Sequence, residues 1–507
     1  MTTAILASDD FQTNTDDKNL EIFCLIWLDE NVNVEVTPDT EKKLRSIINH
    51  LRKFQDVKQC QQYIEQRSKN DRLILIISGQ LGREIVPSIH SLRQVISIYV
   101  YCMDKKSNEQ WPCKFPKVKN VVVELDELIS QIRADHKIQK KVKEPLPINF
   151  FTKKNVGEDK SISILNGEFI FHEVLIHCLL RLKYTETDKA ELVKLCRIEY
   201  EGNHSELNNL YEFEEKYSSN NVLSWYTRES FFYKTLNAAL RTQNIHMIFL
   251  FRKFISDIQH QLQYGQVKSP LRVYRSQMMS NDELDILQRH IGQFISIRSF
   301  FSTSTDRKTA LFFLGNTNSL INLELKGGLF EIDVDPQMVT IKPFADISKD
   351  SHFINELEVL FMIGSIFRLQ SINCSDDHVW IIEMSLCSDD ENDLKEVLLH
   401  MKQQIENEET DLRTLAKVLW KMGRFDLAEK YSKRLLNELS PNDPLIWNLY
   451  EDLGELASHT RDYDMSVQWK QKALEFKIQN KSTGEFIKRT SIIFKREFHA
   501  RMSEFLA

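Results

Sequence analysis

The pattern of apolar and polar positions divides the chain into three parts, and the first part predicts a parallel sheet. Between Leu20 and Glu144, short apolar runs alternate with polar segments that have apolar residues at helical spacing. Such alternation is typical of an α/β domain with helices on both faces of the sheet. The predicted strands are IFCLIWL (22–28), LILIISG (73–79), VISIYVYC (95–102) and VVVEL (121–125), with crossover helices over 41–54 and 82–92.

The size and pattern of residues 20–144 suit a flavodoxin-like or receiver-like domain, preceded by a disordered segment, 1–19. Asp29 and Glu30 follow the first strand at its carboxyl end, where open parallel sheets bind their ligands. Acidic residues in such loops more often face solvent or cap helices, so a ligand role is the weaker interpretation. Gly79-Gln80-Leu81-Gly82 lacks the remaining residues of either phosphate-binding fingerprint and is predicted to be a plain turn.

The second part predicts an α+β domain over 166–387, after a basic, proline-bearing linker over 145–165. Residues 166–265 have aromatic and aliphatic residues at three- and four-residue spacing, which predicts a helical lobe. Residues 266–387 form short apolar or alternating runs, which predict a β core with one helix over 306–314, capped by Ser304 or Thr305. Histidines 172 and 177 are five residues apart and do not share a helix face, so we expect no metal pair.

The third part is helical and internally similar. An acidic linker and helix over 388–411 precedes residues 412–507, in which 415–436 and 453–474 align at an offset of 38. The alignment resembles two tetratricopeptide repeats, with a final helix over 485–505 as their cap. An ordinary helical hairpin is the alternative.

Composition narrows the classes of function. A length of 507 residues suggests about three domains. The net charge of −7 provides no basic surplus for nucleic acid or anionic lipid. The richest apolar run, 359–367, is too short to span a membrane, and the N-terminus does not have the pattern of a secretory signal. Eight cysteines without a Cys-x-x-Cys predict reduced thiols, with neither a disulfide framework nor a zinc site. We therefore expect a cytoplasmic protein without a metal and with neither nucleic acid nor membrane as a partner.

Three short motifs at strand ends are candidates for chemistry. Arg275 ends the run LRVYR, and Ser302-Thr303-Ser304 ends the run QFISIRSFFSTS. Glu356-Leu357-Glu358 enters the most apolar strand of the chain, and acidic-x-acidic triplets are otherwise common by chance. Since residues i and i+2 of a strand point to the same face, the two carboxylates are predicted to project together.

This ordered set of motifs resembles the arginine-specific mono-ADP-ribosyltransferases, which include clostridial-type toxins and animal ectoenzymes. Residues 225–241, with Trp225-Tyr226-Thr227 at their start, look like the helical lobe of the animal members, so the resemblance covers about 200–385. It implies a glycosyltransferase that uses NAD or NADP as co-substrate, transfers ADP-ribose to protein arginine and releases nicotinamide. Ser276, where relatives often have Gly, and Leu357, where some have a third acid, depart from the family pattern without removing a catalytic atom.

The resemblance also implies roles for four residues. Glu358 would hydrogen-bond the nicotinamide ribose and stabilise its oxocarbenium-like transition state, and Glu356 would orient or deprotonate the acceptor guanidinium. Arg275 would hold the phosphate or ribose side of NAD, and Ser302 would position Glu358 and the nicotinamide ribose. The loop over 342–353 carries Phe344 and Phe353, which would help to recognise the target protein or would simply anchor the loop.

Two other functions stay open at this point. One is a catalytically silent scaffold that binds partners through the α/β domain and the helical repeats. The other is an NAD glycohydrolase with water as acceptor, for which Glu356 would be dispensable. In each case the helical repeats are expected to bind a peptide or protein partner.

Overall fold

The computed structural model describes residues 21–69, 71–108, 110–143, 146–151, 160–314, 325–338, 342–352, 357–388 and 410–480. The chain forms two compact units. The first comprises 1–166 with 185–391, and the second comprises 167–184 with 392–507.

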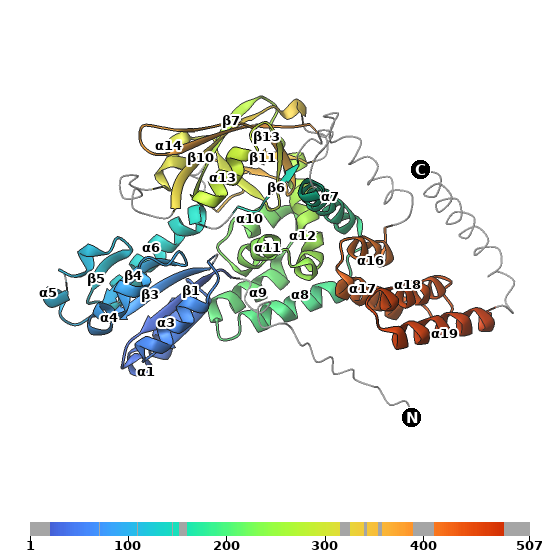
Figure 1. Cartoon of the computed structure of the whole chain (residues 1–507), viewed down its shortest axis with the longest axis horizontal. Coiled ribbons are helices and arrows are strands. Elements are labelled where there is room, and N and C mark those ends of the chain that lie inside the picture. Colours follow the sequence, from blue (N-terminus) through green and yellow to red (C-terminus); the bar gives the residue numbers. More distant parts are fainter. Residues whose placement is uncertain are drawn as a thin grey trace. The chain divides into compact units, whose positions relative to one another are not determined.

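The N-terminal part of the first unit is a five-stranded parallel sheet with helices on both faces, as predicted (Figure 1). Its strand order, β2-β1-β3-β4-β5, is that of flavodoxin-like doubly wound sheets. The strands are β1 (Phe23–Leu28), β2 (His50–Phe54), β3 (Arg72–Ser78), β4 (Val95–Tyr101) and β5 (Val118–Val122). The helices are α1 (Val32–Glu35), α2 (Pro38–Arg45), α3 (Val57–Gln66), α4 (Gly79–Ile89), α5 (Lys105–Asn108) and α6 (Leu125–Lys143), with a 3-10 turn over Pro112–Lys114.

Two local predictions in this sheet domain are wrong. Residues 50–54, predicted as helix, form edge strand β2, whose half-buried and exposed positions lack the apolar run that marks a buried strand. Gly79 to Gly82 form the first turn of α4, where a Cβ on Gly79 would lie 2.6 Å from Asn108 Oδ1. The buried Asp29 accepts a hydrogen bond from the backbone N of Asn31 at 2.7 Å, which is the local, non-ligand role.

The second sheet has nine strands in the order β11-β12-β9-β7-β10-β14-β13-β8-β6 and is mixed, since β10 and β14 are parallel and the other pairs antiparallel. The linker predicted over 145–165 is wrong in part, because residues 148–151 form strand β6 on β8. Ile148 and Phe150 pack against the core of this sheet, which explains the pairing. The strands are β6 (Ile148–Phe151), β7 (Leu271–Ser280), β8 (Phe294–Ile297), β9 (Phe301–Ser304), β10 (Leu325–Val334), β11 (Phe344–Asp346), β12 (Glu358–Phe361), β13 (Ser365–Cys374) and β14 (Trp380–Leu386).

A lobe of helices precedes this sheet in the sequence, and an aromatic cluster around the buried Phe213 forms its core. Its helices are α8 (Glu186–Glu199), α9 (His204–Lys216), α10 (Val222–Thr227), α11 (Phe231–Thr242) and α12 (Ile245–Tyr264), with a 3-10 turn over Ser219–Asn221. Two helices, α13 (Asn281–Arg289) and α14 (Arg307–Phe312), lie between strands, and a 3-10 turn over Pro336–Met338 follows β10. The N-cap of α14 is Asp306, which accepts from Lys308 and Thr309, and not Ser304 or Thr305 as predicted.

The N-terminal α/β domain contacts the helical lobe through polar groups. Asn203 Nδ2 donates to the carbonyl of Arg45 at 2.8 Å, and Asn49 Nδ2 donates to the carbonyl of Glu199 at 2.9 Å. His50 Nε2 lies 3.2 Å from Glu199 Oε1. The two parts of the first unit are thus tied together at the edge of the sheet that β2 forms.

The second unit contains α7 (Lys160–Arg181) from residue 167 onward and two helical hairpins. The sequence assigns residues 167–184 to the helical lobe, whereas the structure groups them with the C-terminal helices. The hairpins are formed by α16 (Leu412–Lys421) with α17 (Phe425–Glu438), and by α18 (Leu445–His459) with α19 (Tyr463–Asn480). Gly423 and Arg461, which are 38 residues apart, both have left-handed φ values of 73° and 65° in the equivalent turns. The internal similarity therefore corresponds to two hairpins of like geometry, and their assignment as tetratricopeptide repeats stays a prediction. The predicted helix over 485–505 and nearly all of the acidic segment over 388–411 lie outside the described residues.

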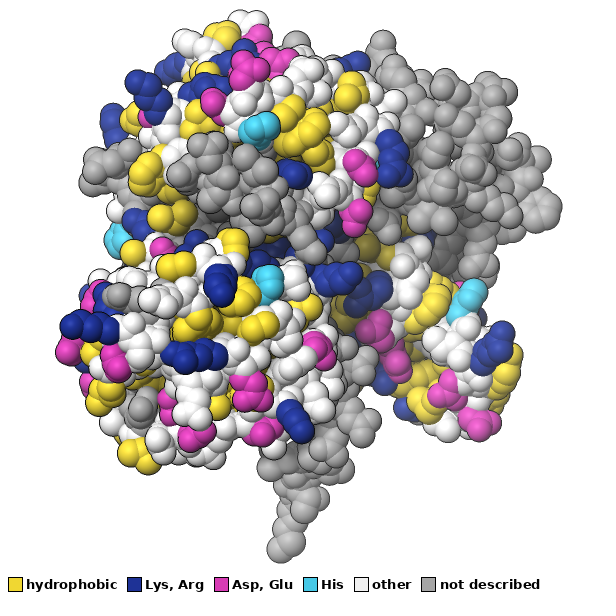
Figure 2. All heavy atoms as spheres, turned by 60° about the vertical axis from the view of Figure 1, so that its left-hand side comes forward, with side chains coloured by type: hydrophobic (Ala, Val, Ile, Leu, Met, Phe, Trp, Pro, Cys, Tyr) yellow, Lys and Arg dark blue, Asp and Glu magenta, His cyan; other side chains and the backbone are white. Residues whose placement is uncertain are grey.

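All eight cysteines are free thiols; Cys113 and Cys374 are exposed. Within the described ranges, no helix has the length and apolar character to cross a membrane. The same ranges contain no group of three or more metal-ligating side chains. On the face in Figure 2, Lys and Arg side chains are interspersed with Asp and Glu.

Candidate functional site

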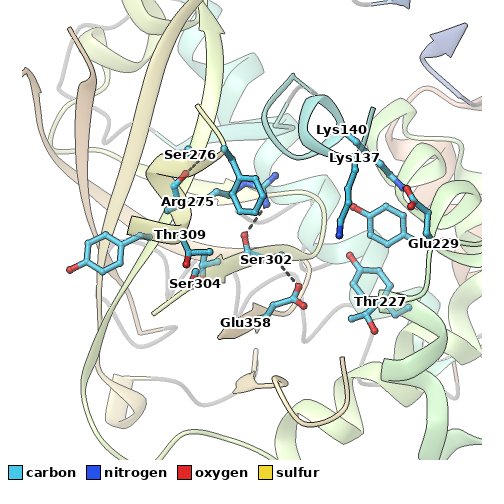
Figure 3. A pocket seen from close by; sticks show the side chains of 16 residues that line it. Lys137, Lys140, Thr227, Glu229, Arg275, Ser276, Ser302, Ser304, Thr309 and Glu358 are labelled. Carbon is cyan, nitrogen blue, oxygen red and sulfur yellow. Dashed lines mark hydrogen bonds and ion pairs between the residues drawn. The ribbon is translucent and has the colours of Figure 1, made fainter. Parts of the chain in front are cut away.

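Three adjacent strands bring Arg275, Ser302 and Glu358 to one pocket (Figure 3). Arg275 lies on β7, Ser302 on β9 and Glu358 at the start of β12. Ser304 of β9 pairs with Tyr274 of β7 on one side and with Glu358 of β12 on the other. Strand β9 therefore holds β7 and β12 in register. The structure therefore brings together three of the four residues that the sequence singles out.

The carboxylate of Glu358 is buried and held by two hydroxyl groups. Ser302 Oγ donates to Glu358 Oε1 at 2.5 Å, and Ser351 Oγ donates to Glu358 Oε2 at 3.1 Å. Glu358 is only 8 % exposed. Hydrogen bonds to an ionised acceptor are short and strong, so the two hydroxyls fix the orientation of the carboxylate.

Arg275 faces the same pocket with part of its hydrogen-bonding capacity unused. Its Nη1 donates to the carbonyl of Ser302 at 2.8 Å, and its guanidinium lies 5.3 Å from the centre of the Phe301 ring. Among the described residues its buried Nε has no hydrogen-bond partner. Burial lowers the pKa of Arg275, and the neighbouring Tyr233, Tyr226 and Glu358 oppose that shift. An arginine retains its charge in proteins, so a half-buried cation whose Nε has no partner among the described residues lines the pocket.

Glu356 lies outside the described residues, so its projection together with Glu358 stays a prediction. The strand begins at Glu358, and Leu357 before it has a φ of 47°, which is left-handed and not extended. The alternation of side chains along this strand thus begins at Glu358. Leu357 is 48 % exposed, so this turn in the chain is at the surface.

The helical lobe supplies aromatic and polar groups to the pocket. Tyr226, Thr227 and Tyr233, which belong to the segment on which the resemblance of the lobe rests, line it. Thr227 Oγ1 accepts from the backbone N of His352 at 3.0 Å, which ties the loop before β12 to α10. Burial raises the pKa values of both tyrosines, so their hydroxyls stay protonated near neutral pH.

Several pocket residues are not singled out by the sequence analysis. They are Ser351, which bonds Glu358, and Lys137, Lys140 and Glu229 at the side of the pocket that α6 forms. Lys137 and Lys140 fall in the predicted α/β domain, just before the linker predicted over 145–165, and the sequence gives them no role. For Phe344, the sequence leaves target recognition and anchoring of the loop as alternatives. Phe344 is fully buried, and its ring is stacked on that of Phe361 with the ring centres 5.1 Å apart. It therefore anchors its loop and cannot recognise a target. Phe353 lies outside the described residues.

Comparison with known proteins identifies the class of this part of the chain. Residues 203–389 match the model of the ADP-ribosyltransferase exoenzyme family, and this segment includes Arg275, Ser302, Glu356 and Glu358. The match covers the central part of the chain and is a similarity to the ADP-ribosyltransferase exoenzyme family. No curated protein sequence matches the chain.

Several solved structures of ADP-ribosyltransferases are similar to a part of the chain. Plx2a, a toxin from Paenibacillus larvae, is 15% identical over 35% of this chain and 90% of its own, with a TM-score of 0.27. HopU1 of Pseudomonas syringae is 14% identical over 41% of this chain and 99% of its own, with a TM-score of 0.29. C3stau2 from S. aureus, solved with NAD, is 14% identical over 36% of this chain and 92% of its own, with a TM-score of 0.24.

Proposed function

We propose that the protein transfers single ADP-ribose groups from NAD to arginine side chains of other proteins. The observation that carries the proposal is the carboxylate of Glu358, held by Ser302 and Ser351 in a pocket that Arg275 also lines. In the reaction, the bond between the nicotinamide nitrogen and ribose C1′ breaks, and a bond from C1′ to an arginine nitrogen forms. Nicotinamide leaves with the bonding electron pair.

Glu358 is proposed as the catalytic carboxylate. As nicotinamide leaves, the ribose gains positive charge at C1′, and a fixed negative group beside the sugar stabilises that charge. The two hydroxyls hold the carboxylate in place before the reaction, so little reorganisation is needed. A preorganised group of this kind commonly contributes about 100- to 1,000-fold in rate.

Arg275 is proposed to bind NAD, and Ser302 is proposed to position Arg275 and Glu358 relative to each other. The unused Nε donor of Arg275 and its positive charge suit a phosphate or ribose oxygen of NAD, because charge-assisted bonds to phosphate are strong. Tyr226 and Tyr233 provide aromatic surface for the flat nicotinamide ring. Ser302 connects the two charged residues, since its carbonyl accepts from Arg275 and its hydroxyl donates to Glu358.

Arginine as acceptor rests on Glu356, two positions before Glu358. A carboxylate matches a guanidinium in bidentate geometry and can take its proton when the new bond forms. If the carboxylate of Glu356 does not have this role, ADP-ribose would be transferred to water instead of arginine, and the protein would be an NAD glycohydrolase. The helical hairpins of the second unit are proposed to select the protein target by binding one of its segments.

The test is incubation of the full chain with NAD labelled in its adenylate part and an arginine-rich protein. Label on the protein supports transfer, free ADP-ribose alone supports hydrolysis, and neither supports a silent scaffold. We expect Glu358→Gln to abolish both reactions and Glu356→Gln to lose transfer while some hydrolysis remains. Glu215→Gln, on the exposed side of α9, is the matched control and should react like wild type. Full arginine transfer by Glu356→Gln would remove the role given to that residue.

A further inference from the structure

The pocket of the transferase domain is not lined by that domain alone. Lys137 and Lys140 line it from α6, the last helix of the N-terminal α/β domain, outside the segment 203–389 that matches the transferase family. Figure 3 shows the side chain of Lys137 extending from α6 into the pocket, and that of Lys140 extending toward Glu229 at its edge. A residue three positions after another lies on the same face of a helix, so the two ammonium groups act on one region.

The α/β domain holds α6 firmly in this place. Leu128 and Ile132 are fully buried in the core on one face of the parallel sheet. One turn further along, the buried His136 packs edge-on against Phe23 of β1, with ring centres 4.8 Å apart. The helix therefore presents its last turns to the pocket as part of a folded domain.

The charges around the pocket favour an anion. Its charged lining consists of Lys137, Lys140 and Arg275 against Glu229 and Glu358. Glu358 is engaged by two hydroxyls, and Glu229 lies 3.5 Å from Lys140 Nζ. The lining thus has one more positive than negative group, and one of the positive groups is the half-buried guanidinium of Arg275.

A bound anion would stabilise the charged form of Lys140. Its side chain is 14 % exposed, and its ammonium lies 4.1 Å from the centre of the Tyr233 ring. Burial lowers the pKa of Lys140 to about 8, although the nearby Glu229 opposes the shift. A phosphate at hydrogen-bond distance would favour the charged form, so ligand binding and protonation of Lys140 would support each other.

We propose that Lys137 and Lys140 bind the pyrophosphate of the dinucleotide, so that the N-terminal α/β domain completes the NAD site. The inference rests on the proposed function and extends it, because it assigns part of the substrate site to a domain outside the transferase segment. Lysine is a common ligand of phosphate as a mobile point charge, and two lysines on one helix face match the two charges of a pyrophosphate. Arg275 lines the same pocket from β7.

The experiment measures binding of ADP-ribose and of nicotinamide to the full chain by calorimetry. ADP-ribose contains the pyrophosphate and lacks the nicotinamide, so only its affinity should depend on the lysines. We expect Lys137→Gln and Lys140→Gln each to weaken ADP-ribose binding about 10-fold, with nicotinamide binding unchanged. Arg133→Gln removes one charge from an exposed position one turn earlier on α6, outside the pocket, and should bind like wild type. Lys137 is itself exposed, so its variant tests the inference even if the Lys140 variant fails to fold.

A pH series separates the contribution of Lys140 from that of Lys137. The titratable groups around Lys140 are His136 on its own helix, Glu229, Tyr233 and Lys234 from the helical lobe, and Glu21 before β1. His136 has a pKa lowered to about 3, mainly by burial, so it stays neutral in the range of interest. As the pH rises through about 8, Lys140 loses its proton and ADP-ribose affinity should fall. Lys137→Gln should keep this fall, and Lys140→Gln should lack it.

The outcomes separate this inference from the proposed function. If wild type binds neither NAD nor ADP-ribose, the proposed function fails. If wild type binds ADP-ribose and both lysine variants bind it equally well, only the role of α6 is overturned and the transferase assignment stands.

Discussion

The hydroxyl group of Ser302 offers the sharpest test of how Glu358, the proposed catalytic carboxylate, is held. Ser302→Ala removes the 2.5 Å bond to Glu358 Oε1 and leaves the 3.1 Å bond from Ser351 in place. The carboxylate keeps its charge but gains freedom to rotate, so the loss should be in the chemical step rather than in NAD binding. A hydrogen bond to a charged group contributes roughly 1.5 to 3 kcal/mol, which corresponds to about 10- to 150-fold in kcat.

The assay is release of nicotinamide from labelled NAD, with kcat and KM determined separately. Ser371→Ala is a matched control, because Ser371 Oγ donates to Glu383 Oε2 at 2.7 Å between β13 and β14 of the same sheet, outside the pocket. It removes an equivalent serine–glutamate bond and should leave kcat unchanged. Ser351→Ala should lower kcat less than Ser302→Ala, and the double variant should lose less than the product of the two effects, since both hydroxyls hold one carboxylate. Equal kcat values for Ser302→Ala and wild type would refute the idea that this hydroxyl preorganises Glu358.

The remaining predictions concern stability. Glu206 and Lys234 form a buried ion pair at 2.8 Å in the helical lobe, with side chains 2 % and 6 % exposed. Glu206→Gln leaves the buried ammonium of Lys234 without its counter-ion. It should therefore lower the free energy of unfolding by about 3 to 5 kcal/mol. Chemical denaturation of the full chain, followed by tryptophan fluorescence, measures this, and a loss below 1 kcal/mol would contradict it. In the hairpin turns, Gly423→Ala should destabilise and Arg461→Gly should stabilise the C-terminal unit, each by about 1 kcal/mol, because both positions have left-handed φ values. Thermal unfolding checks the pair, and effects of the same sign would exclude backbone conformation as the cause.

The sequence predicts well those features that buried apolar runs mark. The parallel sheet follows from the runs that became β1, β3 and β4, whose side chains are almost all buried. The convergence of Arg275, Ser302 and Glu358 follows from three motifs in a known order. Edge strands are missed, because β2 has half-buried and exposed positions and β6 is short and lies next to prolines.

At the site, the backbone conformation of Leu357 and the position of the α6 lysines were not predicted, for a different physical reason. The direction of a side chain depends on the backbone angles of its neighbours, and nothing in Glu356-Leu357-Glu358 announces the left-handed φ of Leu357. The lysines of α6 are missed because their role depends on contacts between two domains. Their sequence is only a basic stretch, and the packing of α6 beside β7 brings them to the pocket.

The short strand β6 has a consequence for anyone who divides the chain into fragments. It lies at the end of the nine-stranded sheet, so a cut between residues 145 and 165 that leaves it with the N-terminal fragment uncovers the backbone of β8. A bare sheet edge recruits strands from other molecules, and an excised transferase fragment that begins after Phe151 should aggregate. Retention of residues 146–151 on such a fragment would protect that edge and would still leave the lysines of α6 behind.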